Sequence, residues 1–414
     1  MYTQPIPFEP DLTVQPEVVA FFDEPTNTIS YILKDPNSDA CAVIDSVMDF
    51  DYASGNIAYD GADRIILHIQ EHGWVLQWLI ETHVHADHLS AAPYIQSKLG
   101  GKLGIGDQIC VVQDTFGKIF NEGTEFQRDG SQFDRLFKDG DSYRIGTLTA
   151  HTLFTPGHTP ADMVHVIGNA AFVGDTLFMP DGGSARADFP GGDARTLYQS
   201  IQRLLTLPGE MRLFMCHDYG PNGRAIRWES TVAEQRHHNI HVGHGTSEDD
   251  FVKMRENRDK TLSMPKLIIP SLQVNMRAGQ LPPAGDDGKT YLKVPINGLN
   301  TSKEYSHMAI QKIDEHFAQS PQIRPDDVSL IAEAGYRAII CARPDGEDTG
   351  QPSFAEIAAV AERFGLKAYH IPVSGQLTEG HLIRFEQARA ETDGPILGYC
   401  RSGGRAGSLY AASL

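Results

Sequence analysis

The stretch from His83 to His88, HVHADH, constrains this chain more than any other feature of its sequence. It places three imidazoles and one carboxylate within six residues, directly after an apolar segment, Val75–Ile80. Imidazole and carboxylate are ligands that zinc and iron prefer in proteins. A strand that ends in a sharp turn can aim alternate side chains at one point. A surface histidine cluster is the competing interpretation, so the rest of the chain has to decide.

Three later stretches add further candidate ligands, each where a predicted strand ends. His158 lies in TPGHT, Asp175 lies in GDT, and His217 lies in CHD. Side chains that follow neighbouring strands tend to meet at one edge of a sheet, and converging His and Asp residues define a site. The sequence therefore predicts a metal centre built from four strand ends. The three later strands are predicted at 148–155, at 164–173 with an interruption near residue 168, and at 212–216.

The order HxHxDH, PGHT, GD and HD resembles the metallo-β-lactamase superfamily over roughly residues 20–262. This resemblance implies an αββα sandwich with the metal at one edge of the two sheets. Within the superfamily, three stretches resemble the persulfide dioxygenases. They are ETHVHADHLS at 81–90, SARADFPGGDARTLYQSI at 184–201 and CHDYG at 216–220.

The resemblance to persulfide dioxygenases implies one non-haem Fe(II) per chain, held by His83, His158 and Asp175. Two histidines and one carboxylate leave open positions for a substrate sulfur and for dioxygen. The implied reaction oxidises glutathione persulfide with O₂ and water to sulfite and glutathione. We therefore expect a dioxygenase that acts in sulfur metabolism.

The remaining polar residues of these motifs leave an alternative open. In the iron enzyme, His85, Asp87, His88 and His217 would orient the ligands and polarise the substrate. In a glyoxalase II-like thioesterase, the same residues would help to bind two zinc ions that generate a hydroxide. A third alternative is a persulfide sensor with a degenerate metal domain. The flanking similarity favours the iron enzyme.

Glutathione carries two carboxylates, so its binding needs cationic side chains even though the chain has a formal net charge of −19. That charge argues against a general binder of nucleic acid or of anionic membranes. Among the cations we favour Arg277, while Arg186 resembles the structural partner of Asp188. The candidates for substrate binding are Arg186, Arg277 and Lys293, and the further candidates are Arg224 and Arg227.

The cysteines and the N-terminus bear on the compartment. The five cysteines are scattered and form no CxxC pair, which is unlike a disulfide framework or a zinc ribbon. Residues 1–12 have no basic flank, and no apolar run approaches the roughly 20 residues that a membrane span needs. We expect a reduced, cytoplasmic protein that binds neither membrane nor nucleic acid. The sequence is also compatible with a homo-oligomer.

A length of 414 residues predicts two domains. Residues 1–263 form the first. Residues 264–301 are rich in Pro and Gly but hold short apolar pieces, so we expect an arm packed on the first domain rather than a linker. Residues 302–414 alternate again between apolar runs and helical patterns, which predicts a smaller α/β domain.

Two helix starts are predicted from capping residues. Ser90 is expected to cap a helix over 90–99, and Ser353 with Glu356 forms the pattern of a capping box before a helix over 353–364. Apolar spacing predicts two further helices, over 62–72 and 195–205.

The loop from Cys400 to Arg405, CRSGGR, ends a predicted strand and opens the final helix. Successive backbone N–H groups there bind anions and lower the pKa of a thiol. Arg405 stands five positions after Cys400, which matches the six-residue loop of rhodanese-type sulfurtransferases. Cysteine phosphatases would have their arginine at Ala406, and residues 370–375, where their acid is expected, contain no carboxylate.

Residues 302–414 also resemble a bacterial sulfurtransferase-like family that is commonly fused to metallo-β-lactamase domains. The stretches RPDGE at 343–347 and HIPVSGQ at 370–376 carry this resemblance. Because the family's framework is itself phosphatase-like, phosphatase activity stays open. We predict that Cys400 takes sulfane sulfur from thiosulfate or a persulfide and passes it to glutathione, or works in reverse. Arg401 and Arg405 would stabilise the donor and the thiolate.

Overall fold

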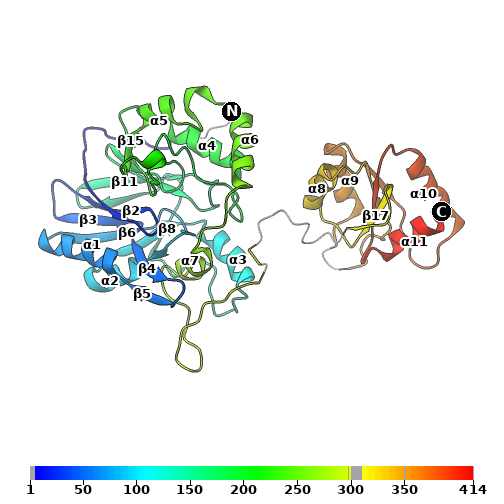
Figure 1. Cartoon of the computed structure of the whole chain (residues 1–414), viewed down its shortest axis with the longest axis horizontal. Coiled ribbons are helices and arrows are strands. Elements are labelled where there is room, and N and C mark those ends of the chain that lie inside the picture. Colours follow the sequence, from blue (N-terminus) through cyan, green and yellow to red (C-terminus); the bar gives the residue numbers. More distant parts are fainter. Residues whose placement is uncertain (1–4, 297, 300–309, 349–350, 414) are drawn as a thin grey trace. The chain divides into compact units, whose positions relative to one another are not determined.

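The computed structural model describes residues 5–296, 298–299, 310–348 and 351–413. The chain divides into two compact units, Met1–Thr301 and Ser302–Leu414 (Figure 1). Among the described residues, every helix is too short or too polar to cross a membrane.

The first unit contains two six-stranded sheets. The apolar runs predicted as strands at Ala40–Ile44 and Val75–Ile80 pair in parallel in the first sheet, which confirms both predictions. The order of that sheet is β1 (Glu17–Asp23), β2 (Thr28–Lys34), β3 (Ala40–Ile44), β6 (Val75–Ile80), β8 (Lys102–Gly106) and β9 (Arg135–Phe137).

The second sheet holds the strands that lead to the later motifs. Gly168 has a φ of 57° and turns the chain between β12 (Met163–Ile167) and β13 (Ala170–Phe172), so the predicted interruption is a tight hairpin. The order is β10 (Ser142–Ile145), β11 (Leu148–Phe154), β12 (Met163–Ile167), β13 (Ala170–Phe172), β14 (Arg212–Phe214) and β15 (Glu229–Thr231).

The two sheets face each other across a buried apolar layer that includes Tyr31, Phe172 and Phe214. Helices cover the outer face of each sheet, which gives the expected αββα sandwich. The first sheet is covered by α1 (Asp60–Glu71), α2 (Ala92–Leu99), α3 (Ile109–Ile119) and α7 (Ile268–Asn275). The second is covered by α4 (Ala194–Leu204), α5 (Val232–His238) and α6 (Glu248–Asp259).

Contrary to the prediction, Ser90 is not the N-cap residue of α2, because Ala91 occupies that position, although the Ser90 hydroxyl oxygen accepts from the Ala92 N–H at 3.1 Å. The helix begins at Ala92, and Ser90 belongs to the short strand β7 (Leu89–Ser90), opposite Val47 of β4 (Val47–Asp51). β4 also pairs with β5 (Asn56–Ala58) in this small sheet. The Ser90 hydroxyl donates a hydrogen bond to the buried Glu81 carboxylate, at an oxygen–oxygen distance of 2.5 Å.

The second unit is a five-stranded sheet with helices on both faces. The predicted capping box of Ser353 and Glu356 is present at α9. The sheet order is β16 (Gln311–Lys312), β17 (Phe317–Ser320), β20 (Ile396–Tyr399), β18 (Ala338–Cys341) and β19 (Lys367–His370). One face carries α8 (Val328–Glu333) and α9 (Phe354–Arg363), and the other carries α10 (Glu379–Ala390) and α11 (Gly404–Ala412).

Candidate metal centre and cysteine loop

The predicted iron ligands converge in the first unit. His83 follows β6, His158 follows β11, and Asp175 follows β13. All three are buried, and one ligand atom of each lies within 4.8 Å of the others. The Asp175 carboxylate lies 3.5 Å from His158 Nε2 and 4.0 Å from His83 Nε2. Residues from three strand ends thus share one small volume.

The other motif residues surround this group. His217 Nε2 lies 3.1 Å from an Asp87 oxygen and 3.4 Å from Asp175 Oδ1. His85, Asp87 and His88 form a second group whose ligand atoms also lie within 4.8 Å of one another. The arrangement therefore offers donors for one metal ion or for two.

Four of the histidine rings are oriented by a hydrogen bond from Nδ1. His158 donates to the carbonyl of Arg186 at 2.8 Å, and His83 contacts Thr82 Oγ1 at 3.0 Å. His88 and His217 donate to the carbonyls of Leu89 and Asn27, each at 3.2 Å. All four rings therefore direct Nε2 toward the candidate metal site. Burial disfavours the charged form of His217, but Asp87 and Asp175 outweigh it and raise its pKa well above the usual range, so this ring has to lose a proton before it binds a metal.

His85 is held the opposite way round. Its Nε2 lies 2.9 Å from Asp45 Oδ1 and 3.4 Å from Glu81 Oε2, so Nδ1 is the free nitrogen. Burial disfavours the charged ring, yet the Asp45 carboxylate outweighs burial and raises the pKa of His85 well above its usual range. His85 is therefore fixed by two buried carboxylates that the motif analysis did not include.

The atoms that face the centre fit a divalent metal. Within the described part of the chain, His83 Nε2, His85 Nδ1, His88 Nε2, His217 Nε2 and Asp175 Oδ1 are buried without a hydrogen-bond partner. Buried polar atoms normally find partners, so five such atoms on residues of the adjoining ligand groups indicate a site for one or two ions. Burial lowers the pKa of His88 to about 3 and that of His83 well below 6.5, which keeps both rings in the neutral form that binds metals.

Gly157 brings the PGHT turn against α4. Its φ is 139°, and a Cβ at this position would lie 2.3 Å from Leu197 Cα. Any larger residue would push the turn away from the helix, and His158 is the next residue along that turn. The glycine is required by this close approach as well as by its backbone angle.

The cationic side chains predicted to bind substrate already have acidic partners. Arg186 forms the predicted pair with Asp188, at 2.5 and 2.7 Å. Arg277 and Lys293 both contact Glu122, at 2.7 and 3.2 Å. Arg277 also lines a cavity of about 320 Å³, with its guanidinium 4.5 Å from the centroid of Phe126. A role for these cations in substrate binding stays a prediction.

Sequence reasoning missed several residues of the centre. Asp45 follows β3 directly, so it carried the same strand-end signal as the motif residues. Tyr219 is 57% exposed, and its ring stacks on His217 with the centroids 6.1 Å apart. Asn275 has no local signal at all, because it reaches the motif from a distant helix.

In the second unit, Cys400 follows β20 and its thiol is buried. The Gly403 N–H donates to Cys400 Sγ at 3.1 Å. Burial alone would raise the pKa of Cys400, but the N–H groups of Ala406, Ser402 and Arg405 outweigh it and hold the pKa below its ordinary value. The loop thus stabilises a thiolate, as a nucleophilic cysteine requires.

Glu347 fixes the arginine of this loop. Its two oxygens accept from Arg405 Nη1 and Nη2 at 2.7 and 2.8 Å, and one also accepts from Arg343 Nε at 2.8 Å. The Val373 carbonyl accepts from Arg405 Nη1 at 2.9 Å. Arg401 is different, because its side chain is 68% exposed and lies 3.3 Å from Asp348. Arg405 is therefore held in place, whereas Arg401 extends into solvent.

Cys341 and Cys216 lie outside the Cys400 loop. Cys341 pairs with Tyr399 across the sheet and packs with the apolar cluster under α8 and α9. Cys400 packs with the cluster on the opposite face. The sheet therefore separates the two thiols. Cys216 is buried beside His85 and His217, and burial raises its pKa.

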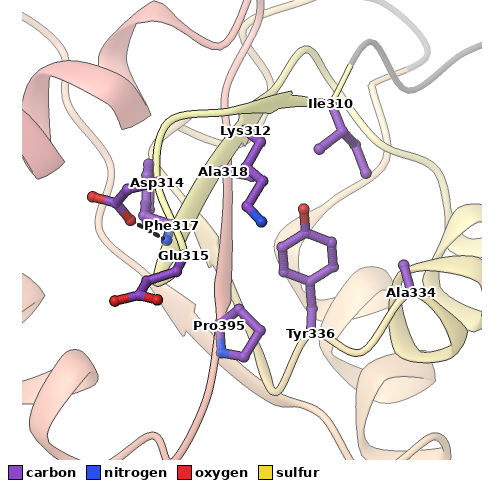
Figure 2. A pocket seen from close by; sticks show the side chains of 9 residues that line it. All are labelled: Ile310, Lys312, Asp314, Glu315, Phe317, Ala318, Ala334, Tyr336 and Pro395. Carbon is purple, nitrogen blue, oxygen red and sulfur yellow. Dashed lines mark hydrogen bonds between the residues drawn. The ribbon is translucent and has the colours of Figure 1, made fainter.

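A cavity of about 410 Å³ opens elsewhere in the second unit (Figure 2). Lys312 and Tyr336 extend into it, and Phe317 and Pro395 line it at the strand beginnings. Cys400 follows the carboxyl end of β20, where sites in parallel sheets form. The cavity lies at the amino ends of β17 and β20, so it is separate from the cysteine loop.

Comparison with known families agrees with this division of the chain. Residues 24–217 match the metallo-beta-lactamase superfamily. Residues 309–414 match the phosphatase-like domain of beta-lactamase hydrolase-like proteins.

Curated relatives are similar to about two thirds of the chain. A probable metallo-hydrolase of Burkholderia pseudomallei is 54% identical over 68% of this chain and 99% of its own length. Glyoxylase B2 of Dictyostelium discoideum is 45% identical over 65% of this chain and 92% of its own length. The mitochondrial persulfide dioxygenase ETHE1 of Homo sapiens is 32% identical over 62% of this chain and 87% of its own length. The chain belongs to the metallo-β-lactamase superfamily, and a beta-lactamase hydrolase-like, phosphatase-like domain follows its metal-binding domain.

Proposed function

We propose that this chain is a bifunctional sulfur enzyme: the first unit oxidises glutathione persulfide, and the second transfers sulfane sulfur through Cys400. The observation that carries the proposal is the buried group of His83, His158 and Asp175, with its partnerless inward-facing atoms. The 32% sequence identity to a persulfide dioxygenase supports this proposal. Its partners would be glutathione, dioxygen and a sulfane donor such as thiosulfate. The free state of all five cysteines suits a reducing cytoplasm.

His83, His158 and Asp175 would hold one Fe(II), which when bound supplies the redox chemistry that lets dioxygen react with a sulfur anion. The overall reaction consumes glutathione persulfide, O₂ and water and yields glutathione, sulfite and two protons. The Arg186 carbonyl fixes the ring of His158, and Thr82 fixes the ring of His83. Tyr219 offers an exposed ring beside the centre for contact with the substrate.

In the second unit, the Cys400 thiolate would attack the outer sulfur of thiosulfate. A new S–S bond forms on Cys400 as the bond to the sulfonate breaks, and sulfite leaves with that electron pair. A glutathione thiolate then attacks the outer sulfur, which gives glutathione persulfide and returns the Cys400 thiolate. The loop N–H groups and Arg405 stabilise the thiolate at the start and end of this cycle. Run in reverse, the same steps would consume persulfide and sulfite.

Two assays test the two halves. Iron-loaded protein should take up oxygen when glutathione persulfide is added, and an absence of uptake would refute the first half. Cys400→Ser should abolish the transfer of sulfur from thiosulfate to glutathione or cyanide while oxygen uptake with supplied persulfide continues. Unchanged sulfur transfer in that variant would refute the second half.

A glyoxalase II-like thioesterase is the second candidate, because the chain is 45% identical to a glyoxylase and because His85, Asp87 and His88 form a second ligand group. Metal analysis separates the two. About one iron per chain supports the dioxygenase, whereas two zinc ions support the hydrolase. Hydrolysis of a glutathione thioester by the two-zinc protein would establish the alternative.

A further inference from the structure

The loop that carries the HVHADH motif depends on hydrogen bonds from outside regular structure. Residues 82–88 form neither strand nor helix, so the carbonyls of His85 and His88 have no partner in a sheet. The side chain of Asn275, the last residue of α7, donates from Nδ2 to both carbonyls at 2.8 Å. Its Oδ1 accepts from the Ser90 N–H at 2.8 Å. One buried amide thus satisfies three backbone groups: the carbonyls of His85 and His88 within the motif, and the N–H of Ser90 just after it.

These contacts close a ring that includes a metal-facing histidine. The Ser90 hydroxyl donates to Glu81 Oε1 at 2.5 Å, and Glu81 Oε2 lies 3.4 Å from His85 Nε2. His85 in turn offers its carbonyl to Asn275. The backbone and the ring of His85 are therefore held by one connected set of polar groups.

The position of Asn275 is itself fixed by packing. Leu272, Val274 and Met276 are fully buried in the apolar cluster beneath the first sheet, together with Leu89 and Ile95. The chain turns directly after α7, where Gly279 has a φ of 78°. A Cβ on Gly279 would lie 2.6 Å from Pro93 Cδ, so the turn after α7 packs tightly against α2. The amide cannot drift away from the motif without disturbing this core.

We propose that Asn275 is a positioning residue of the metal centre, which sets the backbone course of the HVHADH loop from the end of α7. The three backbone groups are buried, so they would stay unsatisfied without it. Groups that orient metal ligands typically change metal affinity by about 10- to 100-fold when they are lost. The inference rests on the metal centre of the proposed function and not on its substrate, so a failed persulfide assay does not affect it.

Metal titration of the full chain tests this role. Asn275→Ala should bind Co(II), measured by competition with a chelator, about 10- to 100-fold more weakly than the parent protein. Ser271→Ala is the matched control, because Ser271 Oγ lies buried on the same helix with no hydrogen-bond partner among the described residues. The control should keep parental affinity. Parental affinity in Asn275→Ala would overturn the inference.

A second variant separates a local effect from general unfolding. Asn275→Ser keeps a donor but cannot span both carbonyls, and it decides the question where the alanine variant fails to fold. Amide hydrogen exchange in the metal-free protein should rise in the peptide that covers 82–90 and stay unchanged in the strands of the second sheet. Exchange that is unchanged in 82–90, or that rises equally throughout the first unit, would contradict a positioning role.

Discussion

Replacement of Glu347 by Gln perturbs the cysteine loop without touching Cys400. The Glu347 carboxylate bridges Arg405 and Arg343, and these hydrogen bonds lower its pKa to about 2 from 4.5. A glutamine keeps one acceptor oxygen but turns an NH₂ group toward guanidinium N–H donors. At least one of the three hydrogen bonds is then lost, and the two Nη groups of Arg405 can no longer both donate to this side chain.

The magnitude follows from the exposure of the pair. A hydrogen bond to a charged group contributes about 1.5–3 kcal/mol when it is well shielded. The side chains of Glu347 and Arg405 are 31% and 26% exposed, so solvent screening reduces this figure. We expect the free energy of unfolding of the second unit to fall by about 1–2 kcal/mol, which lowers the Tm of a domain this size by about 4–8 °C per kcal/mol.

A second assay measures the reactivity of the Cys400 thiol in addition to the stability of the second unit. Because Arg405 helps to hold the Cys400 pKa down, the pH profile of Cys400 alkylation by iodoacetamide should move to higher pH in Glu347→Gln. Sulfur transfer near neutral pH should slow accordingly. Glu362→Gln, an exposed carboxylate on α9, makes the same charge change away from the loop and should alter neither profile. An unchanged alkylation profile in Glu347→Gln, with the protein folded, would refute this account of the loop.

Three further outcomes are expected. Gly157→Ala should greatly weaken Co(II) binding in the metal titration, since its Cβ would lie 2.3 Å from Leu197 Cα and displace the turn that carries His158. Removal of the metal by a chelator should lower the calorimetric Tm of the first unit alone, because metal at about 1,000 times its Kd stabilises the folded state by about 4 kcal/mol. Asp35 accepts hydrogen bonds from Ser38 and Thr147 that outweigh burial and lower its pKa to about 2 from 3.8. This stabilisation is complete above about pH 4 and is lost as the pH falls toward 2, so Asp35→Asn should destabilise the protein by about 1–3 kcal/mol at pH 7 and by progressively less in acid, as measured by urea unfolding.

The strand ends explain why much of the metal centre was predictable. Each of His83, His158, Asp175 and His217 lies within four residues of the end of a strand, and the apolar runs of those strands are visible as local pattern. The convergence itself needed the fold, because His83 follows a strand of the first sheet whereas His158, Asp175 and His217 follow strands of the second. Asp45 could have been added by the same argument, since it follows β3.

The helix α7 shows where local pattern fails. Its sequence, IIPSLQVN, contains a proline and lies in a Pro- and Gly-rich stretch, so no helical periodicity was evident. Its helical form comes from burial against the first sheet, because tertiary packing overrides weak propensity. Ser90 is not the N-cap residue of α2 for a related reason: its backbone pairs with β4 and with Asn275, and its hydroxyl satisfies Glu81.

By itself, the amino-acid sequence determined several strands and helices, the residues available to a metal, and the length of the Cys400 loop, because these depend on hydrophobic period and on spacing within a few residues. The αββα sandwich was expected from the resemblance of the motifs to the metallo-β-lactamase superfamily. Only the tertiary structure decided which nitrogen of each histidine is free, that Glu347 holds Arg405, and that Asn275 holds the metal loop across 190 residues. Those contacts depend on the direction of buried side chains from distant elements, which no local pattern encodes.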